Sequence, residues 1–82
     1  MENLLMQYKN NTGMTYRKMT RKICSILRAN NAPMGVLRES VEDYAKSKKQ
    51  PRYDEVSDAI AELIGCTTKE FLASLRACKK AG

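Results

Sequence analysis

Apolar residues recur at helical spacing along most of this chain, and the clearest pattern lies in residues 54–65. The apolar positions that share one helix face there are Val56, Ala59, Ile60, Leu63 and Ile64. Intervals of three and four residues predict an amphipathic helix whose apolar face is buried. Asp54 is a favoured N-cap residue, and Gly65 can take the left-handed conformation that ends a helix. We therefore predict a helix that is capped by Asp54 and ended by Gly65.

A further helix is predicted directly after this one. Thr67 and Glu70 have the T-x-x-E spacing of a capping box, in which each side chain bonds to the main-chain N–H of the other residue. Phe71, Leu72 and Leu75 form the apolar side of this helix. Two helices joined by so short a turn share one core, and we expect the rest of the chain to pack against them.

Three earlier segments also carry helical apolar patterns. The first ends near Asn10, where the turn-forming sequence Asn-Asn-Thr-Gly begins. Its apolar face comprises Met1, Leu4, Leu5 and Tyr8. The second is capped by Thr15 and ends between Cys24 and Ala29. Its apolar face comprises Tyr16, Met19, Ile23, Ile26 and Leu27.

The third of these segments begins at Pro33, which suits the first position of a helix, and it covers residues 33–46. Its apolar stripe comprises Met34, Leu37, Val41, Tyr44 and Ala45. No segment shows the alternation of a half-buried strand. The pattern thus predicts an all-α fold, with residues 1–82 forming one domain built as a compact bundle of about five short helices.

Charge is unevenly distributed along the chain. Its 15 Lys and Arg residues outnumber 9 Asp and Glu residues, which gives a net charge of +6. Cations predominate up to Arg38, whereas acids predominate from Glu39 to Glu62. This excess of positive charge and its uneven distribution along the chain indicate one face that can bind a polyanion and another that cannot.

The best candidate for such a face is the polar side of the second predicted helix. Its cations are Arg17, Lys18, Arg21, Lys22 and Arg28. The helix has no carboxylate four residues from them to neutralise them, so they repel one another unless a polyanion is bound. We predict contact with nucleic acid here. The alternative is a solvated cationic face, paired with acids of the helix at residues 54–65.

A second candidate lies in and before the polar loop at residues 47–52. The residues proposed there are Lys46, Lys48, Lys49, Gln50 and Arg52, and Arg38 is a further candidate from residues 33–46. Loops between helices of DNA-binding domains often contact backbone phosphate, which positions a protein without reading sequence. An ordinary interhelical loop is the competing interpretation.

The residue types present argue against catalysis and metal binding. The chain has no His, the commonest general base, and its three cysteines lie far apart without a C-x-x-C pair. We expect Cys24, Cys66 and Cys78 to be small buried hydrophobes. We therefore expect no enzyme activity, no cofactor, no metal site and no small-molecule substrate. No membrane span or export signal is evident, so we expect a cytoplasmic protein with no membrane partner.

Residues 46–72, KSKKQPRYDEVSDAIAELIGCTTKEFL, resemble the C-terminal half of a Cro/CI-type (lambda-repressor-like) helix-turn-helix domain. In that family a basic loop with a proline precedes a helix of the form x-x-I-A-x-x-L-G and a turn of the form V-S-x-x-x-L. The matching residues are Lys48, Lys49, Pro51, Ile60, Ala61, Leu63 or Ile64, Gly65, Thr67, Phe71 and Leu72. Residues 12–23, TGMTYRKMTRKI, are similar to the start of the family's second helix.

The resemblance implies a helix-turn-helix fold and a small sequence-specific transcriptional regulator, typical of phages and other mobile elements. It also implies a symmetric homodimer on double-stranded DNA, with residues 33–46 in the recognition position. The acids Glu39, Glu42 and Asp43 make that segment a poor reader of the major groove. Charge instead favours the helix that carries Arg17. The alternative functions are a protein-binding adaptor or inhibitor that docks on an acidic partner, and binding to structured RNA.

Overall fold

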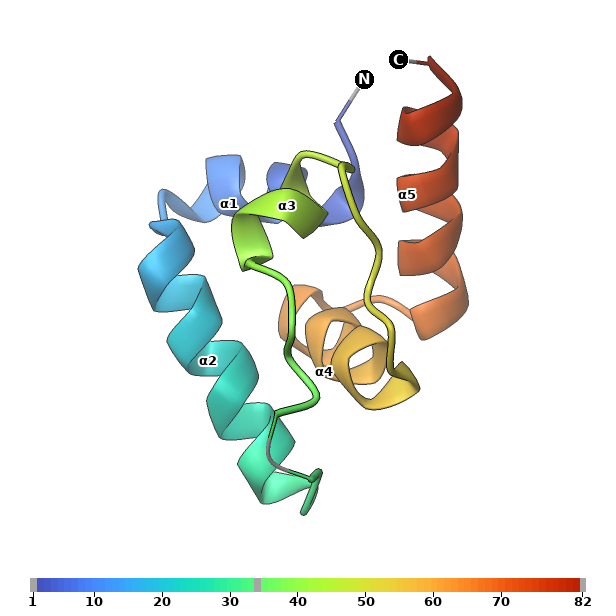
Figure 1. The fold of residues 1–82 in the computed structure, drawn as a ribbon. Helices are drawn as coiled ribbons and strands as arrows, with labels where there is room; N and C mark the ends of the chain where they lie inside the picture. Colours follow the sequence, from blue (N-terminus) through green and yellow to red (C-terminus); the bar gives the residue numbers. More distant parts are fainter. Residues whose placement is uncertain (1, 34, 82) are drawn as a thin grey trace.

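The structure, a computed structural model, describes residues 2–33 and 35–81, and these residues contain five helices and no strand (Figure 1). The helices are α1 (Leu4–Thr12), α2 (Tyr16–Ala29), α3 (Val41–Ala45), α4 (Asp54–Ile64) and α5 (Thr68–Ala81). In Figure 1, α2 and α5 lie on opposite sides of the bundle, and α1 and α3 lie together at one end. The predicted all-α class is confirmed. No helix in the described part of the chain is long and apolar enough to cross a membrane.

Helix α4 packs against α1, α2 and α5. Its side chains Val56, Ala59 and Ile60 are fully buried. Leu63 and Ile64, which the sequence placed on the same apolar face, are only half-buried. The prediction of the buried face is therefore correct for the first two turns of α4, whereas the last turn is more exposed than predicted.

The turn between α4 and α5 has the predicted geometry. Gly65 is left-handed, with φ +80°, and its N–H donates to the carbonyl oxygen of Ala61. The capping box forms in both directions, because the N–H of Glu70 donates to Thr67 Oγ1 (3.1 Å) and the N–H of Thr67 donates to Glu70 Oε1 (3.0 Å). Phe71 is buried behind this turn.

The start of α4 differs from the prediction. Asp54 is the first helical residue and not the cap, and the cap position is taken by Tyr53, whose side chain makes no capping hydrogen bond. Asp54 and Glu55 lie in the first turn, where the helix dipole favours negative charge. The acids therefore stabilise this end through charge.

Helix α2 follows the sequence pattern closely. Thr15 is its N-cap and accepts a hydrogen bond from the N–H of Lys18 (3.1 Å). The helix continues to Ala29, the later of the two predicted ends. Met19, Ile23 and Leu27 are its buried residues. Burial of this stripe sets the rotation of α2 and turns its cationic side outward.

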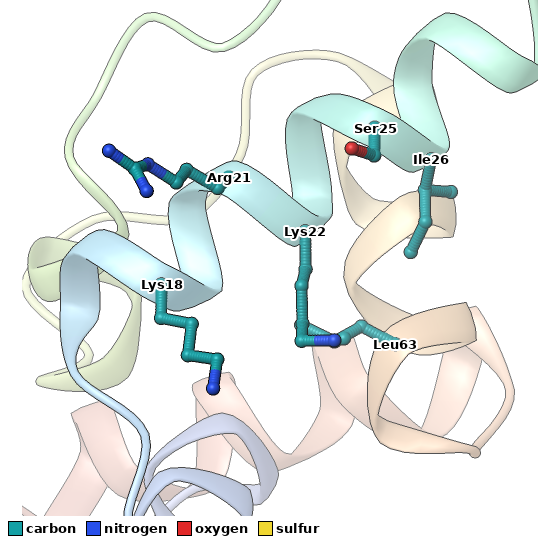
Figure 2. Close-up of a pocket in the computed structure, with 6 residues that line it drawn as sticks. All are labelled: Lys18, Arg21, Lys22, Ser25, Ile26 and Leu63. Carbon is teal, nitrogen blue, oxygen red and sulfur yellow. The ribbon is translucent and has the colours of Figure 1, made fainter.

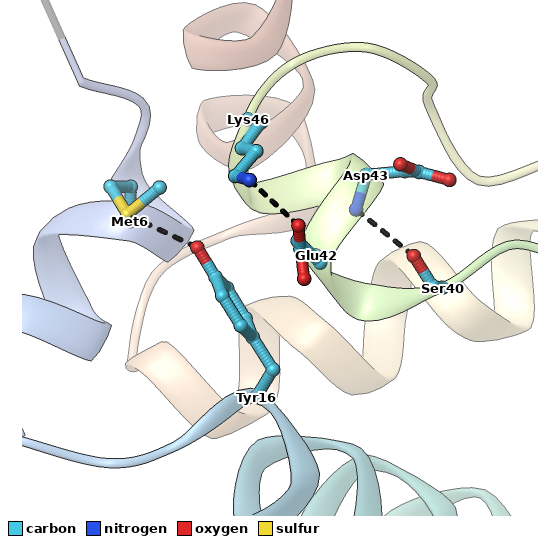
Figure 3. Close-up of polar contacts among 6 residues, drawn as sticks. All are labelled: Met6, Tyr16, Ser40, Glu42, Asp43 and Lys46. Atoms are coloured by element: carbon cyan, nitrogen blue, oxygen red, sulfur yellow. Dashed lines mark hydrogen bonds and ion pairs between the residues drawn. The ribbon is translucent and has the colours of Figure 1, made fainter.

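The helix predicted for residues 33–46 is wrong over most of its length. Within the described part of this segment only Val41–Ala45 is helical, and Ser40 caps it by accepting a hydrogen bond from the N–H of Asp43 (3.2 Å, Figure 3). Gly35 has φ +83°, a left-handed conformation that no α-helix contains. Met34 of the predicted stripe lies outside the described residues. The connection from α2 to α3 thus covers residues 30–40, longer than the turn of about 3–4 residues in a helix-turn-helix motif.

The N-terminal helix begins later and ends later than predicted. Asn3 caps it, and the helix continues past Asn10 to Thr12, where left-handed Gly13 ends it. Leu5 is the buried residue of its face. Met1, which the sequence placed on that face, lies outside the described residues.

The core is formed jointly by all five helices and by Val36 of the connection between α2 and α3. Tyr44 and Phe71 are its largest fully buried side chains. The cysteines differ from the expectation of full burial, because Cys24, Cys66 and Cys78 are all half-buried. Burial raises the pKa of the Cys66 thiol.

Candidate nucleic-acid interface

The cations predicted to form a face on α2 all project into solvent. Exposed side chains on this helix include Arg17, Lys18, Arg21, Lys22 and Arg28. They lie opposite the buried stripe that holds α2 in the bundle. One helix side thus carries five positive charges, as the sequence predicted.

These charges are arranged on two adjoining ridges. Spacings of four and seven residues align Arg17, Arg21 and Arg28 on one ridge, and a spacing of four aligns Lys18 and Lys22 on the other. In Figure 2, the Lys18 and Lys22 side chains extend from the opposite side of α2 to that of Arg21. Lys22 extends toward Leu63 of α4 in the same view. The lysine ridge therefore lies on the side of α2 that faces α4.

Neither ridge is neutralised by the protein itself. Among the described residues, no ion pair within 4.0 Å involves any of the five α2 cations. The alternative in which acids of α4 pair with them is thus not what the structure shows. The acids of α4 face solvent on their own ridge, which comprises Asp54, Glu55, Asp58 and Glu62.

Two of the predicted loop cations are engaged within the protein. Lys46 Nζ lies 2.6 Å from Glu42 Oε2 (Figure 3), and this hydrogen-bonded pair lowers the pKa of Glu42 and raises the pKa of Lys46. Arg52 Nε lies 3.1 Å from Glu39 Oε1. Lys46 and Arg52 therefore form ion pairs within the protein while staying exposed, and their contact with DNA remains a prediction. The Glu42–Lys46 pair was visible in the sequence as a Glu four residues before a Lys on one helix.

Glu39 also holds the only fully buried tyrosine of the core that the described residues contain. The Glu39 side chain is 8% exposed, and its Oε2 accepts a hydrogen bond from the hydroxyl of the buried Tyr44 (2.7 Å). This hydrogen bond lowers the pKa of Glu39. Burial, followed by the bond to Glu39, raises the pKa of Tyr44. The arrangement fixes the connection between α2 and α3 against the loop that carries Arg52.

The remaining predicted cations are Arg38, Lys48 and Lys49, and all three are exposed. The Arg38 guanidinium carbon lies 6.0 Å from the centroid of the Tyr53 ring, at the outer limit of a cation–π contact. Tyr53 is the one large apolar side chain exposed among the described residues, at 38%. Its place beside a cation was not predicted, because the sequence separates it from Arg38 by a whole helix.

A groove lies between the lysine ridge and α4. It has a volume of about 510 Å³, and it is lined by Lys18, Arg21, Lys22, Ser25, Ile26 and Leu63 (Figure 2). Sequence reasoning assigned Ile26 and Leu63 to the core and did not single out Ser25. Ser25 lies in the middle of the cationic side of α2. Its helical spacing from the neighbouring cations is the signal in the sequence that could have placed it there.

The described residues contain no group of three or more His, Cys, Asp or Glu side chains placed to hold a metal ion. Comparison of the chain with protein-family models, with curated proteins and with solved structures finds no significant match. A function for this chain has therefore to be inferred from its own residues and surfaces.

Proposed function

We propose that this protein binds double-stranded DNA through the exposed side of α2 and acts as a small, sequence-specific transcriptional regulator. The observation that carries the proposal is the row of five exposed α2 cations without an ion-pair partner among the described residues. Like charges held together on one rigid helix gain most from a partner that carries regularly spaced negative charge. Duplex DNA offers such charge and releases bound counterions when it is neutralised.

The dimensions of the cationic side agree with a duplex partner. Arg17 and Arg28 are separated by eleven residues of one helix, which corresponds to about 17 Å at 1.5 Å per residue. The major groove of B-DNA is wide enough to admit an α-helix, and arginine is the side chain that most often contacts guanine there. The arginine ridge is therefore the part of α2 that we assign to base contacts.

Helix α3 is the weaker candidate for the groove. It has five residues, and its first turn carries Glu42 and Asp43. A helix this short with acids at its N-terminus repels phosphate. We accordingly assign DNA contact to α2. The resemblance of residues 46–72 to Cro/CI-type domains would instead place residues 33–46 in the recognition position.

Lys48 and Lys49 provide a second, non-specific contact in the proposal. Both are exposed, and neither forms an ion pair within 4.0 Å among the described residues. Contacts of this kind fix the position of a protein on the duplex without reading its sequence. The resemblance adds a homodimer on two half-sites and an origin in a phage or another mobile element.

Selection from sheared genomic DNA tests the proposal. The purified protein is incubated with the fragments at moderate salt, and the retained fragments are sequenced. We expect a shared motif among the retained fragments. The Arg17→Ala, Arg21→Ala double variant serves as the control and should retain no such motif. Retention of the same fragments by wild type and variant would contradict the proposal.

A further inference from the structure

The groove between α2 and α4 combines apolar and cationic groups in a way that DNA does not require. Ile26 and Leu63 are half-buried and form its apolar part. Lys18, Arg21 and Lys22 supply its charge, and no acid lines it. Phosphate can pair with the lysines, but it has nothing to place against two aliphatic side chains. The groove therefore suits a partner that is both apolar and acidic.

The layout of the groove gives the shape of that partner. Lys18, Lys22 and Ile26 follow one another at intervals of four residues, so they form a straight row along α2. The row covers about 12 Å, or about two helical turns. Leu63 faces this row from α4 (Figure 2). A second helix laid along the row can place apolar residues at intervals of three and four against Ile26 and Leu63.

We propose that this groove binds an acidic amphipathic helix of a protein partner. The apolar side of that helix contacts Ile26 and Leu63, and its carboxylates pair with Lys18 and Lys22. Charge complementarity selects this occupant, because the groove carries cations that no acid of the described residues neutralises. A membrane surface fits less well, since Tyr53, the one large apolar side chain exposed among the described residues, lies outside the groove.

A synthetic peptide tests the proposal directly. The probe is a fluorescein-labelled peptide of about 14 residues, long enough for roughly four helical turns, with Leu at positions i, i+4 and i+7 and with Glu and Ala elsewhere. A peptide of the same composition with the leucines spread around the helix is the control. We expect fluorescence anisotropy to show micromolar binding of the amphipathic peptide and binding at least tenfold weaker for the control. Equal affinity for the two peptides would overturn the proposal, because charge alone would then account for binding.

Two charge reversals on the same helix locate the site. Lys22→Glu changes the groove, whereas Arg17→Glu makes the same change on the other ridge of α2. We expect Lys22→Glu to weaken the amphipathic peptide at least tenfold and Arg17→Glu to change its affinity by less than threefold. Lys18→Glu should repeat the effect of Lys22→Glu, and circular dichroism confirms that each variant folds. Equal losses from Lys22→Glu and Arg17→Glu would overturn the proposal.

This inference does not depend on DNA binding. Duplex DNA measured in parallel with the same variants separates the two proposals, because DNA is expected to respond most to Arg17→Glu. Peptide binding without DNA binding would overturn the proposed function and leave the groove as the functional surface. DNA binding without discrimination between the two peptides would overturn the groove proposal and leave the proposed function intact.

Discussion

The side-chain amide of Asn3 donates a hydrogen bond to the main-chain carbonyl of Tyr44 over 2.9 Å, across 41 residues of sequence. The same amide nitrogen lies 2.9 Å from the carbonyl oxygen of Ala45. Asn3 Oδ1 accepts from the N–H of Met6 at the start of α1. One buried side chain, 1% exposed, thus caps the first turn of α1 and binds the last carbonyls of α3. It fixes α3 in place although α3 has only five residues.

Replacement of Asn3 should therefore destabilise the fold as a whole. Asn3→Ala removes an N-cap, which costs about 1 kcal/mol. It also takes a donor from the carbonyl of Ala45 and from that of Tyr44, which keeps the Ser47 N–H, and this loss costs about 1–3 kcal/mol. We expect a loss of about 2–4 kcal/mol in the free energy of unfolding, measured by urea denaturation. Asn10→Ala removes an exposed hydrogen bond to Glu2 and should change this free energy by less than about 0.5 kcal/mol. Equal effects of the two changes would contradict the role of Asn3.

The packing of α5 against α4 predicts that replacing α5 side chains by alanine lowers the free energy of unfolding according to how deeply each side chain is buried. Phe71 is fully buried, so Phe71→Ala should lower the free energy of unfolding by about 3–5 kcal/mol. Leu72 is half-buried, and Leu72→Ala should cost less than half as much. Thermal melting followed by circular dichroism measures both. A larger loss from Leu72→Ala would mean that the rotation of α5 described here is wrong.

The bond between Glu39 and Tyr44 predicts sensitivity to acid. The Tyr44 hydroxyl lowers the pKa of Glu39 in the folded protein, so the unfolded chain binds a proton more readily. Stabilisation by this carboxylate is present above the ordinary glutamate pKa of about 4.3 and is lost as pH falls through the lowered folded pKa. We expect stability to fall less steeply below about pH 4.3 in Glu39→Gln than in the wild type.

Urea denaturation between about pH 2.5 and pH 6 measures this difference. Glu42 and Glu70 also have lowered pKa values, so part of the acid sensitivity should remain in Glu39→Gln. Glu55→Gln removes one acid from an exposed position of α4 and serves as the control for charge. Identical curves for Glu39→Gln and the wild type would show that the Glu39 carboxylate is not linked to folding.

The two candidate DNA contacts should differ in kind. Arg21→Ala should cost about 1–3 kcal/mol on the preferred sequence and weaken preference at particular base pairs. Lys49→Ala should weaken binding to all duplexes alike and reduce the magnitude of the salt slope by about one unit. Electrophoretic mobility shift with matched and mismatched duplexes separates these outcomes. Loss of sequence preference on Lys49→Ala, with preference intact in Arg21→Ala, would place the specific contact in the loop.

The helices with strong local signals were predictable from the sequence. Thr15, Gly65 and the Thr67–Glu70 capping box each act within one turn of their own helix, and the structure uses them as predicted. The outward side of α2 was predictable for the same reason, since burial of one stripe fixes where its cations point. Local spacing is sufficient to predict the structure where contacts between residues close in sequence determine it.

Residues 33–46 were not predictable in this way. Their apolar positions fit a helix, but Gly35 is left-handed and the segment is held by distant partners. Asn3 binds the carbonyls at the end of α3, and Arg52 pairs with Glu39. Neither contact follows from local spacing.

The salt dependence of duplex binding tests the central claim most directly. Anisotropy of a labelled DNA duplex is measured over a range of salt concentrations for the wild type and for the Arg17→Ala, Arg21→Ala, Arg28→Ala variant. If the five α2 cations together with Lys48 and Lys49 replace about seven counterions on the duplex, the wild-type plot of log K against log salt should have a slope of roughly −6, and the variant, which keeps four of these cations, a slope of roughly −4. A wild-type affinity that does not change with salt, or an equal slope in the variant, would contradict DNA binding through α2.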